Sequence, residues 1–368
     1  MRSLELAVKY LAGDRIIGTA AERAAMSTAA TYDVGVWKEI GRASAQNNST
    51  VNKPCALDPV CPYLMILTCH TPYEQTNTDP ALRFNTDTGT NYVRRRSQNH
   101  AAYDTANQAG LVYHGGTSAC PEFDVAFVTN TSASQEKMAV MHGFNGKGNN
   151  SSDAGVSSET YGKWTNTSAL ISTVNLYNIQ GGTPLFKSGS EIVVLGFDPD
   201  DTTGAVSKWV KLKEVTLESD GDTLETGTSG WTSKKYMLME AHIERADGNS
   251  ITPHLRFNGD DGGNYTRIRS GDGGSPAHNT GQTTIDFSEG ENSLNQYYTY
   301  WINNVSAEAK LCIGHTTGDD TGATAPSRKE IMGKWNDTSE VIDNISIFNN
   351  GGAGSFKAGS KITVWGFD

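Results

Sequence analysis

Two acidic, glycine-containing loops are the segments whose residue types come nearest to metal chemistry. They read NTDTGTN over residues 85–91 and NGDDGGN over residues 258–264. Carboxylate and amide oxygens suit calcium, but neither loop has the bidentate Glu that an EF-hand carries downstream, and the first loop has a single carboxylate. The alternative is a hairpin turn in which Asn, Asp and Gly accept positive φ. We favour turns around Asp87 and Asp260 over calcium loops and expect no metal-binding residue.

Two arginine pairs have a spacing that could recognise an acid. Arg94 and Arg96, like Arg267 and Arg269, stand two residues apart, so each pair projects from one face of a strand. Such a pair could clasp a carboxylate on a neighbouring subunit. Solvated or locally paired arginines are the more common arrangement, and we favour that interpretation.

One tryptophan and one histidine recur in both halves of the sequence, Trp164 with Trp335 and His142 with His315. An exposed Trp ring would give a sugar a surface on which to stack, whereas a Trp beside a strand more often fills a core. We favour core filling. No metal-ligand spacing surrounds either histidine, so a structural hydrogen bond is favoured over a metal site.

No set of side chains has the spacing of a catalytic centre. Asp87 and Asp260 lie in the expected turns, and Asp198 and Asp368 follow the last strand of each half. A Ser elbow, a Cys/His pair and a phosphate-cradling loop are all missing from the sequence contexts that they require. We therefore expect that the protein is not an enzyme and has no catalytic or cofactor-binding residue. A glycoside hydrolase, a third alternative, would need two carboxylates that face each other across a cleft.

Four of the five cysteines lie in the first half of the sequence, and none of these four has a cysteine at the equivalent position of the second half. Cys55 with Cys61, and Cys69 with Cys120, could form two disulfides in an oxidising compartment. Three connectivities and the reduced state all remain open. Cys312, in an apolar strand, is expected to be a small buried side chain.

The sequence repeats itself, and this repeat organises the whole chain. LRFN at residues 82–85 recurs at 255–258, GKW at 162–164 recurs at 333–335, and FKSGS at 186–190 recurs as FKAGS at 356–360. Collinear matches of this kind indicate an internal duplication. The copies run over residues 36–198 and 208–368, and each is long enough for its own core. A polar segment with Pro and Gly joins them, as expected of a surface linker.

Short runs of β-branched and aromatic residues, separated by Gly, Asn and Asp, predict an all-β fold. We expect strands at the following pairs of ranges: 63–69 and 236–240, 123–128 and 297–302, 173–177 and 344–348, and 191–197 and 361–367. The turn-forming residues between the last two strands of each copy predict that those two strands are neighbours. Because strands do not alternate with helices, we expect two tandem jelly-roll-like antiparallel β-sandwich domains.

Residues 1–35 have no counterpart in the second copy. Leu4, Val8 and Leu11 fall on one helical face, and Thr19 is a plausible N-cap for an Ala-rich stretch at residues 20–27. Two such short helices could not hold a core alone. The segment is either a frayed terminus or, as we expect, a short helical arm that is buried on docking with another subunit.

Composition excludes several functional classes. The 368 residues carry a net charge of -11, which disfavours a grip on nucleic acid or an anionic membrane. The sequence lacks the run of about 20 apolar residues that a membrane-spanning helix needs. Glu5 and Lys9 interrupt the N-terminal stretch, so a secretory signal is not expected. Sequons occur at Asn130, Asn166, Asn304, Asn336 and Asn344, and glycosylation is left open.

Two stretches resemble structural proteins of tailed viruses. These are RFNGDDGGNY at residues 256–265 and FKAGSKITVWGF at residues 356–367, and GDRIIGTAAER at residues 13–23 is similar to N-terminal segments of such virion components. The resemblance implies a non-enzymatic protein that decorates a capsid, forms a turret at a vertex or builds a tail or fibre attachment. In the first copy Thr86 replaces a Gly of the pattern.

These observations lead to one hypothesis of function and one alternative. The hypothesis is a virion structural protein that is attached to the capsid or tail, contacts other virion proteins and copies of itself, and binds neither nucleic acid nor a membrane. Many weak contacts repeated by symmetry would hold such a subunit. The alternative is a carbohydrate-binding adhesin for cell-surface glycans, in which exposed aromatic rings stack on sugars.

Overall fold

The computed structural model of this protein is all-β in the part of the chain that it describes. It describes residues 36–45, 52–71, 79–99, 101–113, 120–147, 152–153, 155–179, 186–199, 207–272, 274–286, 295–319, 326–351 and 353–368. Within these ranges there is no helix, and so none that could span a membrane. The predicted N-terminal arm over residues 1–35 and most of the predicted linker lie outside the described residues.

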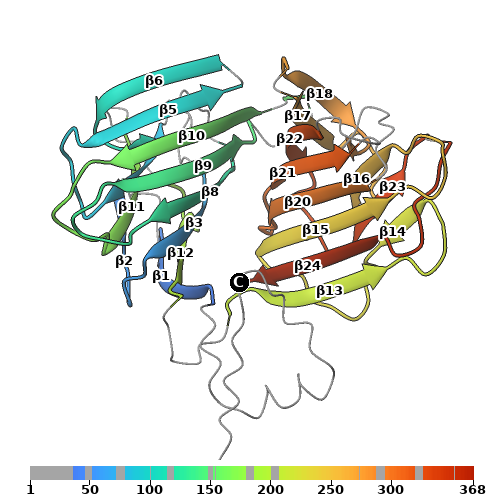
Figure 1. The fold of residues 1–368 in the computed structure, drawn as a ribbon, viewed down its shortest axis with the longest axis horizontal. Coiled ribbons are helices and arrows are strands. Elements are labelled where there is room, and N and C mark those ends of the chain that lie inside the picture. The colour runs from blue at the N-terminus through green and yellow to red at the C-terminus, as the bar shows by residue number, and fades with distance from the viewer. Residues whose placement is uncertain are drawn as a thin grey trace, which may run out of the picture.

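The first half of the chain forms one large and one small sheet (Figure 1). The large sheet contains, in spatial order, β1 (Lys38–Ser44), β12 (Glu191–Phe197), β3 (Tyr63–His70), β8 (Glu122–Thr129), β9 (Lys137–Asn145), β10 (Val156–Trp164), β5 (Tyr92–Gln98) and β6 (Ala101–Gln108). The small sheet contains β2 (Asn52–Ala56), β11 (Thr173–Asn178), β4 (Pro80–Phe84) and β7 (Leu111–Val112). Neighbouring strands are antiparallel.

The second half of the chain has the same strand order. Its large sheet contains β13 (Val210–Thr216), β24 (Lys361–Phe367), β15 (Tyr236–Glu244), β20 (Asn295–Asn303), β21 (Lys310–Asp319), β22 (Ser327–Trp335), β17 (Tyr265–Gly271) and β18 (Ala277–Gln282). Its small sheet contains β14 (Thr223–Glu225), β23 (Ile345–Asn349), β16 (Pro253–Phe257) and β19 (Ile285–Asp286). Thus β1 corresponds to β13, β12 to β24, and each strand between them to its counterpart.

In each half the large sheet packs on the small sheet as a β-sandwich. Alternate apolar residues of both sheets form one buried cluster per half, which includes Phe84, Tyr92 and Trp164 in the first half and Phe257 and Trp335 in the second. The stacked rings of Tyr92 and Trp164 have centroids 6.4 Å apart. Apolar side chains on one face of each strand therefore account for the sandwich, as the alternating pattern predicts.

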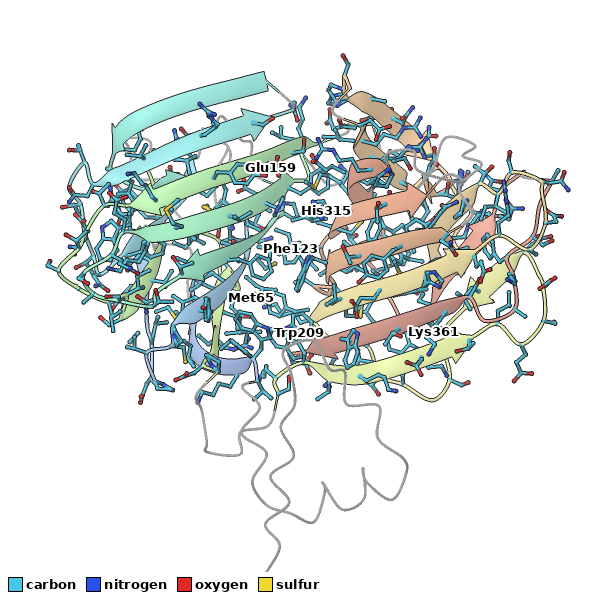
Figure 2. The ribbon with its side chains drawn as sticks, in the orientation of Figure 1. Met65, Phe123, Glu159, Trp209, His315 and Lys361 are labelled. Carbon is cyan, nitrogen blue, oxygen red and sulfur yellow. The ribbon has the colours of Figure 1, made fainter. Side chains whose placement is uncertain are left out.

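The two large sheets also pack against each other through their outer faces. A third apolar cluster joins them, with Phe123 and Val193 from the first half and Tyr236, Leu311 and Phe367 from the second. We call this contact the seam. Figure 2 shows Phe123, Trp209 and His315 at the seam, between the two large sheets. Because the large sheets are covered on both faces here, many of their strands read as continuous apolar runs.

Most of the predicted strands are confirmed, and one predicted pairing is wrong. The four pairs of predicted ranges match β3 with β15, β8 with β20, β11 with β23, and β12 with β24. However, β11 belongs to the small sheet and β12 to the large sheet, so the last two strands of each half are not neighbours. The turn-forming residues between them belong to a connection that crosses the sandwich. The chain passes from the small sheet to the large sheet at this point because both sheets are needed to cover the core.

Candidate functional site

An exposed hollow on the first large sheet is the main candidate site. We call it the apolar groove, and it has a volume of about 410 Å³. Its lining residues are Trp37, Tyr63, Leu64, Phe127, Val128, Thr129, Met138, Val140 and Phe197. Met138 is 53% exposed, Tyr63 41% and Val140 39%, which is unusual for apolar side chains that lie together on a sheet.

The alternation of β9 explains why apolar side chains reach this surface. Lys137, Ala139 and Met141 turn inward and are buried, so Met138 and Val140 turn outward. Across the hollow, the Phe197 ring lies 5.5 Å from the Trp37 ring, centroid to centroid. The groove is therefore built from rigid sheet positions.

Several residues of the second half that correspond to groove residues are buried. By strand register, Tyr236 corresponds to Tyr63, and Leu311 to Met138. Both second-half side chains are fully buried in the seam, and so is Ile313, the counterpart of Val140. These positions of the sheet face are therefore packed in the seam in the second half and exposed in the first, where other residues of the same face, such as Phe123, are buried in the seam.

Charged groups flank the groove at the edge of the sheet. Glu39 accepts a hydrogen bond from Arg42 and forms an ion pair with Lys208 at 2.9 Å. The hydrogen bond from Arg42 and the contacts with Lys208 lower the pKa of Glu39 and outweigh its partial burial. Inside the groove, the hydroxyls of Thr129 and Tyr63 and the indole N–H of Trp37 are the polar side-chain groups among the lining residues. The surface suits apolar protein more than a sugar, which needs several hydrogen-bonding partners.

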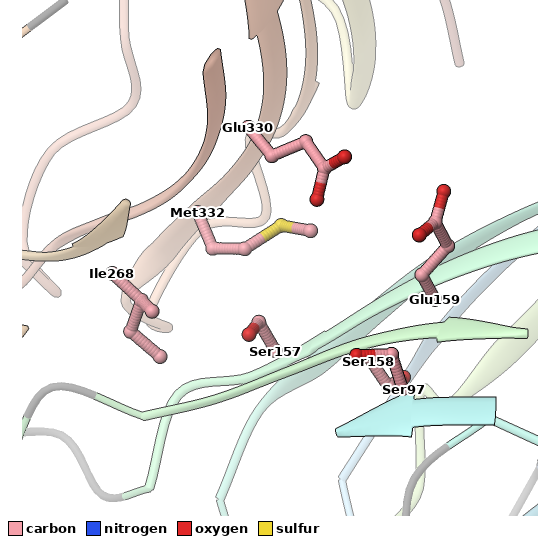
Figure 3. A pocket seen from close by; sticks show the side chains of 7 residues that line it. All are labelled: Ser97, Ser157, Ser158, Glu159, Ile268, Glu330 and Met332. Carbon is pink, nitrogen blue, oxygen red and sulfur yellow. The ribbon is translucent and has the colours of Figure 1, made fainter. Parts of the chain in front are cut away.

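A second cluster, made of equivalent residues, lies in the seam. The rings of His142 and His315 meet with centroids 4.9 Å apart, and the next strands place Glu159 opposite His142 and Glu330 opposite His315. Figure 3 shows Glu159 and Glu330 on opposite sides of the seam. Burial, with the neighbouring His315 ring second, lowers the pKa of His142 to about 4. Burial also lowers the pKa of His315.

The histidines thus contact each other across two sheets, which sequence spacing did not reveal. A ring contact takes the place of the structural hydrogen bond that we favoured. Among the described residues, no group of three or more His, Cys, Asp and Glu side chains could hold a metal ion.

The two loops around Asp87 and Asp260 form tight turns. Asn85 and Thr86 have φ of 52° and 56°, and Asn258 and Gly259 have φ of 51° and 69°. The predicted positive φ is thereby confirmed.

Each aspartate is used as an acceptor of N–H groups. Asp87 accepts hydrogen bonds from the Gly89 amide at 2.8 Å and from the indole of Trp164 at 2.7 Å. Asp260 accepts the Trp335 indole at 2.6 Å. N–H donors aimed at a carboxylate anchor it as an anion, whereas a calcium loop aims oxygens at the ion.

Core filling by the repeated tryptophans is confirmed. Trp164 and Trp335 have no exposed surface, so neither can be a surface on which a sugar stacks. Each indole joins the end of the large sheet to the aspartate of a turn.

Local pairing of arginines is confirmed for the second half. Arg267 and Arg269 both pair with Asp286, at 3.1 Å and 2.5 Å. By strand register Val112 stands in the place of Asp286 in the first half, where Arg94 therefore lacks this acceptor. Burial lowers the pKa of Arg94 to about 10, with the Arg96 charge as the second cause. No carboxylate of a second subunit is needed to satisfy the second-half pair.

All five cysteines are buried and reduced in this structure, so neither of the two disulfides considered above is formed. Cys120 donates a hydrogen bond to Asn145 at 2.9 Å, and Cys69 accepts one from Asn303 in the seam at 3.0 Å. Cys312 is fully buried, which confirms its prediction as a core residue.

A buried cluster of polar side chains in the first half was missed by sequence reasoning. His70 contacts Glu122 at 2.6 Å and Asp124 at 3.6 Å, and Thr68 donates a hydrogen bond to Asp124 at 2.7 Å. Both carboxylates lie on the same face of β8 and have no exposed surface, so they do not face each other across a cleft as a glycosidase requires. The sequence feature that could have predicted this cluster is the presence of Glu122 and Asp124, two residues apart, in an otherwise apolar strand.

Two sequon asparagines hold backbone segments together. The Asn130 amide donates to the Cys61 and Ile171 carbonyls at 3.0 and 3.1 Å, and its counterpart Asn304 bridges Lys234 and Ile342 in the same way. Both asparagines are buried, so a glycan at either one would disrupt the fold.

No protein-family model matches the sequence, and no curated protein matches it. Among solved structures the chain is similar to domains LG4-5 of the mouse laminin alpha1 chain, with 8% identity and a TM-score of 0.21 over 90% of this chain and 91% of that chain. It is also similar to the LG1-3 region of the laminin alpha2 chain, with 8% identity and a TM-score of 0.20 over 86% of this chain and 64% of that chain. Likenesses this weak carry no argument about function.

Proposed function

We propose that this chain is a non-enzymatic structural protein of a tailed-virus particle, attached to the capsid or tail and held by protein-protein contacts. Its body would be two tandem jelly-roll-like sandwiches that arose by internal duplication, with residues 1–35 as an arm. Its partners would be other virion proteins and copies of itself. The collinear sequence matches and the repeated strand order support the duplication.

The apolar groove is the observation that carries the proposal. It presents Tyr63, Met138 and Val140 to solvent at the face that the second half uses as a packed interface. Leaving such a face in water is unfavourable by about 25 cal/mol for each Å² of apolar surface. A surface of this kind is typical of a protein-docking site.

The adhesin alternative finds less support. Trp164 and Trp335, the rings first considered as sugar platforms, are buried in the two cores. The groove, which does expose aromatic rings, offers few hydrogen-bond partners for sugar hydroxyls. We therefore do not propose carbohydrate binding as a second function.

The proposal is tested on virus particles purified from the culture that produces the chain. An antibody raised against the purified chain should label these particles at regular positions in electron micrographs. In a particle-producing system, Met138→Asp should lower the copy number per particle at least about tenfold, as expected from a loss of about 1.4 kcal/mol or more of docking free energy. Tyr297→Asp, at an exposed position of the second half, is the matched control and should be retained. Particles without the antigen would contradict the proposed function.

A further inference from the structure

The size of the apolar groove limits what can fill it. Nine residues line it, whereas a stable interface between two globular proteins uses roughly 20–30 residues a side. A short apolar segment laid into the hollow fits this size better than a second folded domain does. The question is then which segment of protein supplies the apolar side chains.

The chain itself carries a suitable segment. The internal stretches outside the described residues are at most eight residues long, whereas residues 1–35 form one long stretch. Within it Leu4, Val8 and Leu11 are spaced i, i+4 and i+7. This is the spacing with which an amphipathic helix inserts its apolar anchors into a hydrophobic groove.

The point of attachment lies at the groove. Trp37 lines it, and the Trp37 carbonyl accepts a hydrogen bond from the Lys208 amide at 2.7 Å, which fixes this residue. β1 starts at Lys38 opposite Gly196, next to the groove residue Phe197, and runs away from there. Residues 1–35 are therefore joined to the fold at the rim, and covalent attachment near the groove gives a segment of the same chain a high effective concentration there. A segment of the same chain outcompetes one from a dilute second copy.

We propose that the N-terminal segment of the same chain occupies the apolar groove and inserts the Leu4, Val8 and Leu11 stripe between Tyr63, Met138 and Phe197. This inference depends on one part of the proposed function, namely that the groove is a protein-docking surface. It adds the identity of the occupant.

Cysteine cross-linking in the full-length chain tests this proposal. Val8→Cys and Met138→Cys are combined in one chain, and disulfide formation is followed under mild oxidation on non-reducing gels and by mass spectrometry. The five native cysteines are buried and do not compete. The matched control combines Val8→Cys with Tyr297→Cys, since Tyr297 is 42% exposed, close to the 53% of Met138, but lies on the second half.

The proposal predicts an intramolecular disulfide that forms at least about tenfold faster in the Met138→Cys pair than in the control, because docking raises the local concentration. Adding Leu4→Asp and Leu11→Asp should reduce the rate to that of the control. Equal rates in the two pairs would overturn the proposal, and so would a disulfide found only between two chains, which would assign the groove to a neighbouring copy. If cross-linking fails while Met138→Asp still removes the chain from particles, this inference is wrong and the proposed function stands.

Discussion

The contact between His142 and His315 predicts that acid weakens the packing of the two large sheets. Burial, followed by the nearby His315 ring, holds the pKa of His142 at about 4, against about 6.5 for a free histidine. The folded chain therefore keeps this ring neutral while the unfolded chain protonates it. The free energy of unfolding should be unaffected above pH 6.5 and should fall as the pH drops from 6.5 towards 4.

The size of the effect follows from the shift. A difference of about 2.5 pH units corresponds to about 3 kcal/mol. The charged groups that face the cluster are Glu159 and Glu330 on the neighbouring strands, together with Arg328, which lies 3.5 Å from Glu330. Glu159 raises the pKa of His142, but burial and the facing ring outweigh it.

Urea unfolding followed by tryptophan fluorescence at pH 7.5, 6.5, 5.5 and 4.5 measures this loss. We expect His142→Gln to lose about 2 kcal/mol less than the wild-type chain between pH 6.5 and 4.5, which is the part of the full effect that falls within this window. His242→Gln, at an exposed position of β15, is the control and should follow the wild type. Comparing variants cancels the protonation of carboxylates that all three proteins share. An identical pH dependence in wild type and His142→Gln would refute the reasoning.

Three further substitutions test individual contacts by urea unfolding at neutral pH. Trp335→Phe removes the indole donor to Asp260 and should destabilise the chain by about 1–3 kcal/mol, and an unchanged midpoint would show that the Asp260 anchor is unimportant. Asn130→Ala leaves two buried carbonyls and one buried amide without this partner and should cost about 3 kcal/mol; a cost below about 1 kcal/mol would contradict the bridging role. Thr86→Gly relieves a β-branched residue at φ 56°, where the second half has Gly259, and should stabilise by about 1 kcal/mol, whereas destabilisation would argue against strain there.

Local patterns in the sequence predicted much of the fold. The β-branched runs at residues 191–197 and 361–367 became β12 and β24, because side-chain alternation and burial on two faces leave little other choice. The turns around Asp87 and Asp260 followed in the same way from residues that accept positive φ. The favoured burial of Trp164 and Trp335 is confirmed.

The sequence repeat did not predict every connection between strands. It predicted correctly that the two halves share a strand order. However, we predicted a hairpin between β11 and β12, and the chain instead passes from one sheet to the other there. Turn residues report that the chain reverses direction; they do not report which sheet the next strand joins. That choice depends on which face each strand has to cover, and the residues that decide it are far away in the sequence.

The sequence alone was thus sufficient to predict two β-rich halves. Its net charge of -11 also showed that the chain lacks the positive charge with which proteins bind nucleic acid or anionic membranes. The tertiary structure alone decided which faces are closed and which are open. Tyr63 and Tyr236 are the same residue type at corresponding positions of the two large sheets, yet one is 41% exposed and the other is fully buried. The physical reason is that burial requires two surfaces that pack together. The packing of the two large sheets covers this position in the second half and leaves it exposed in the first, and no local sequence pattern records that packing.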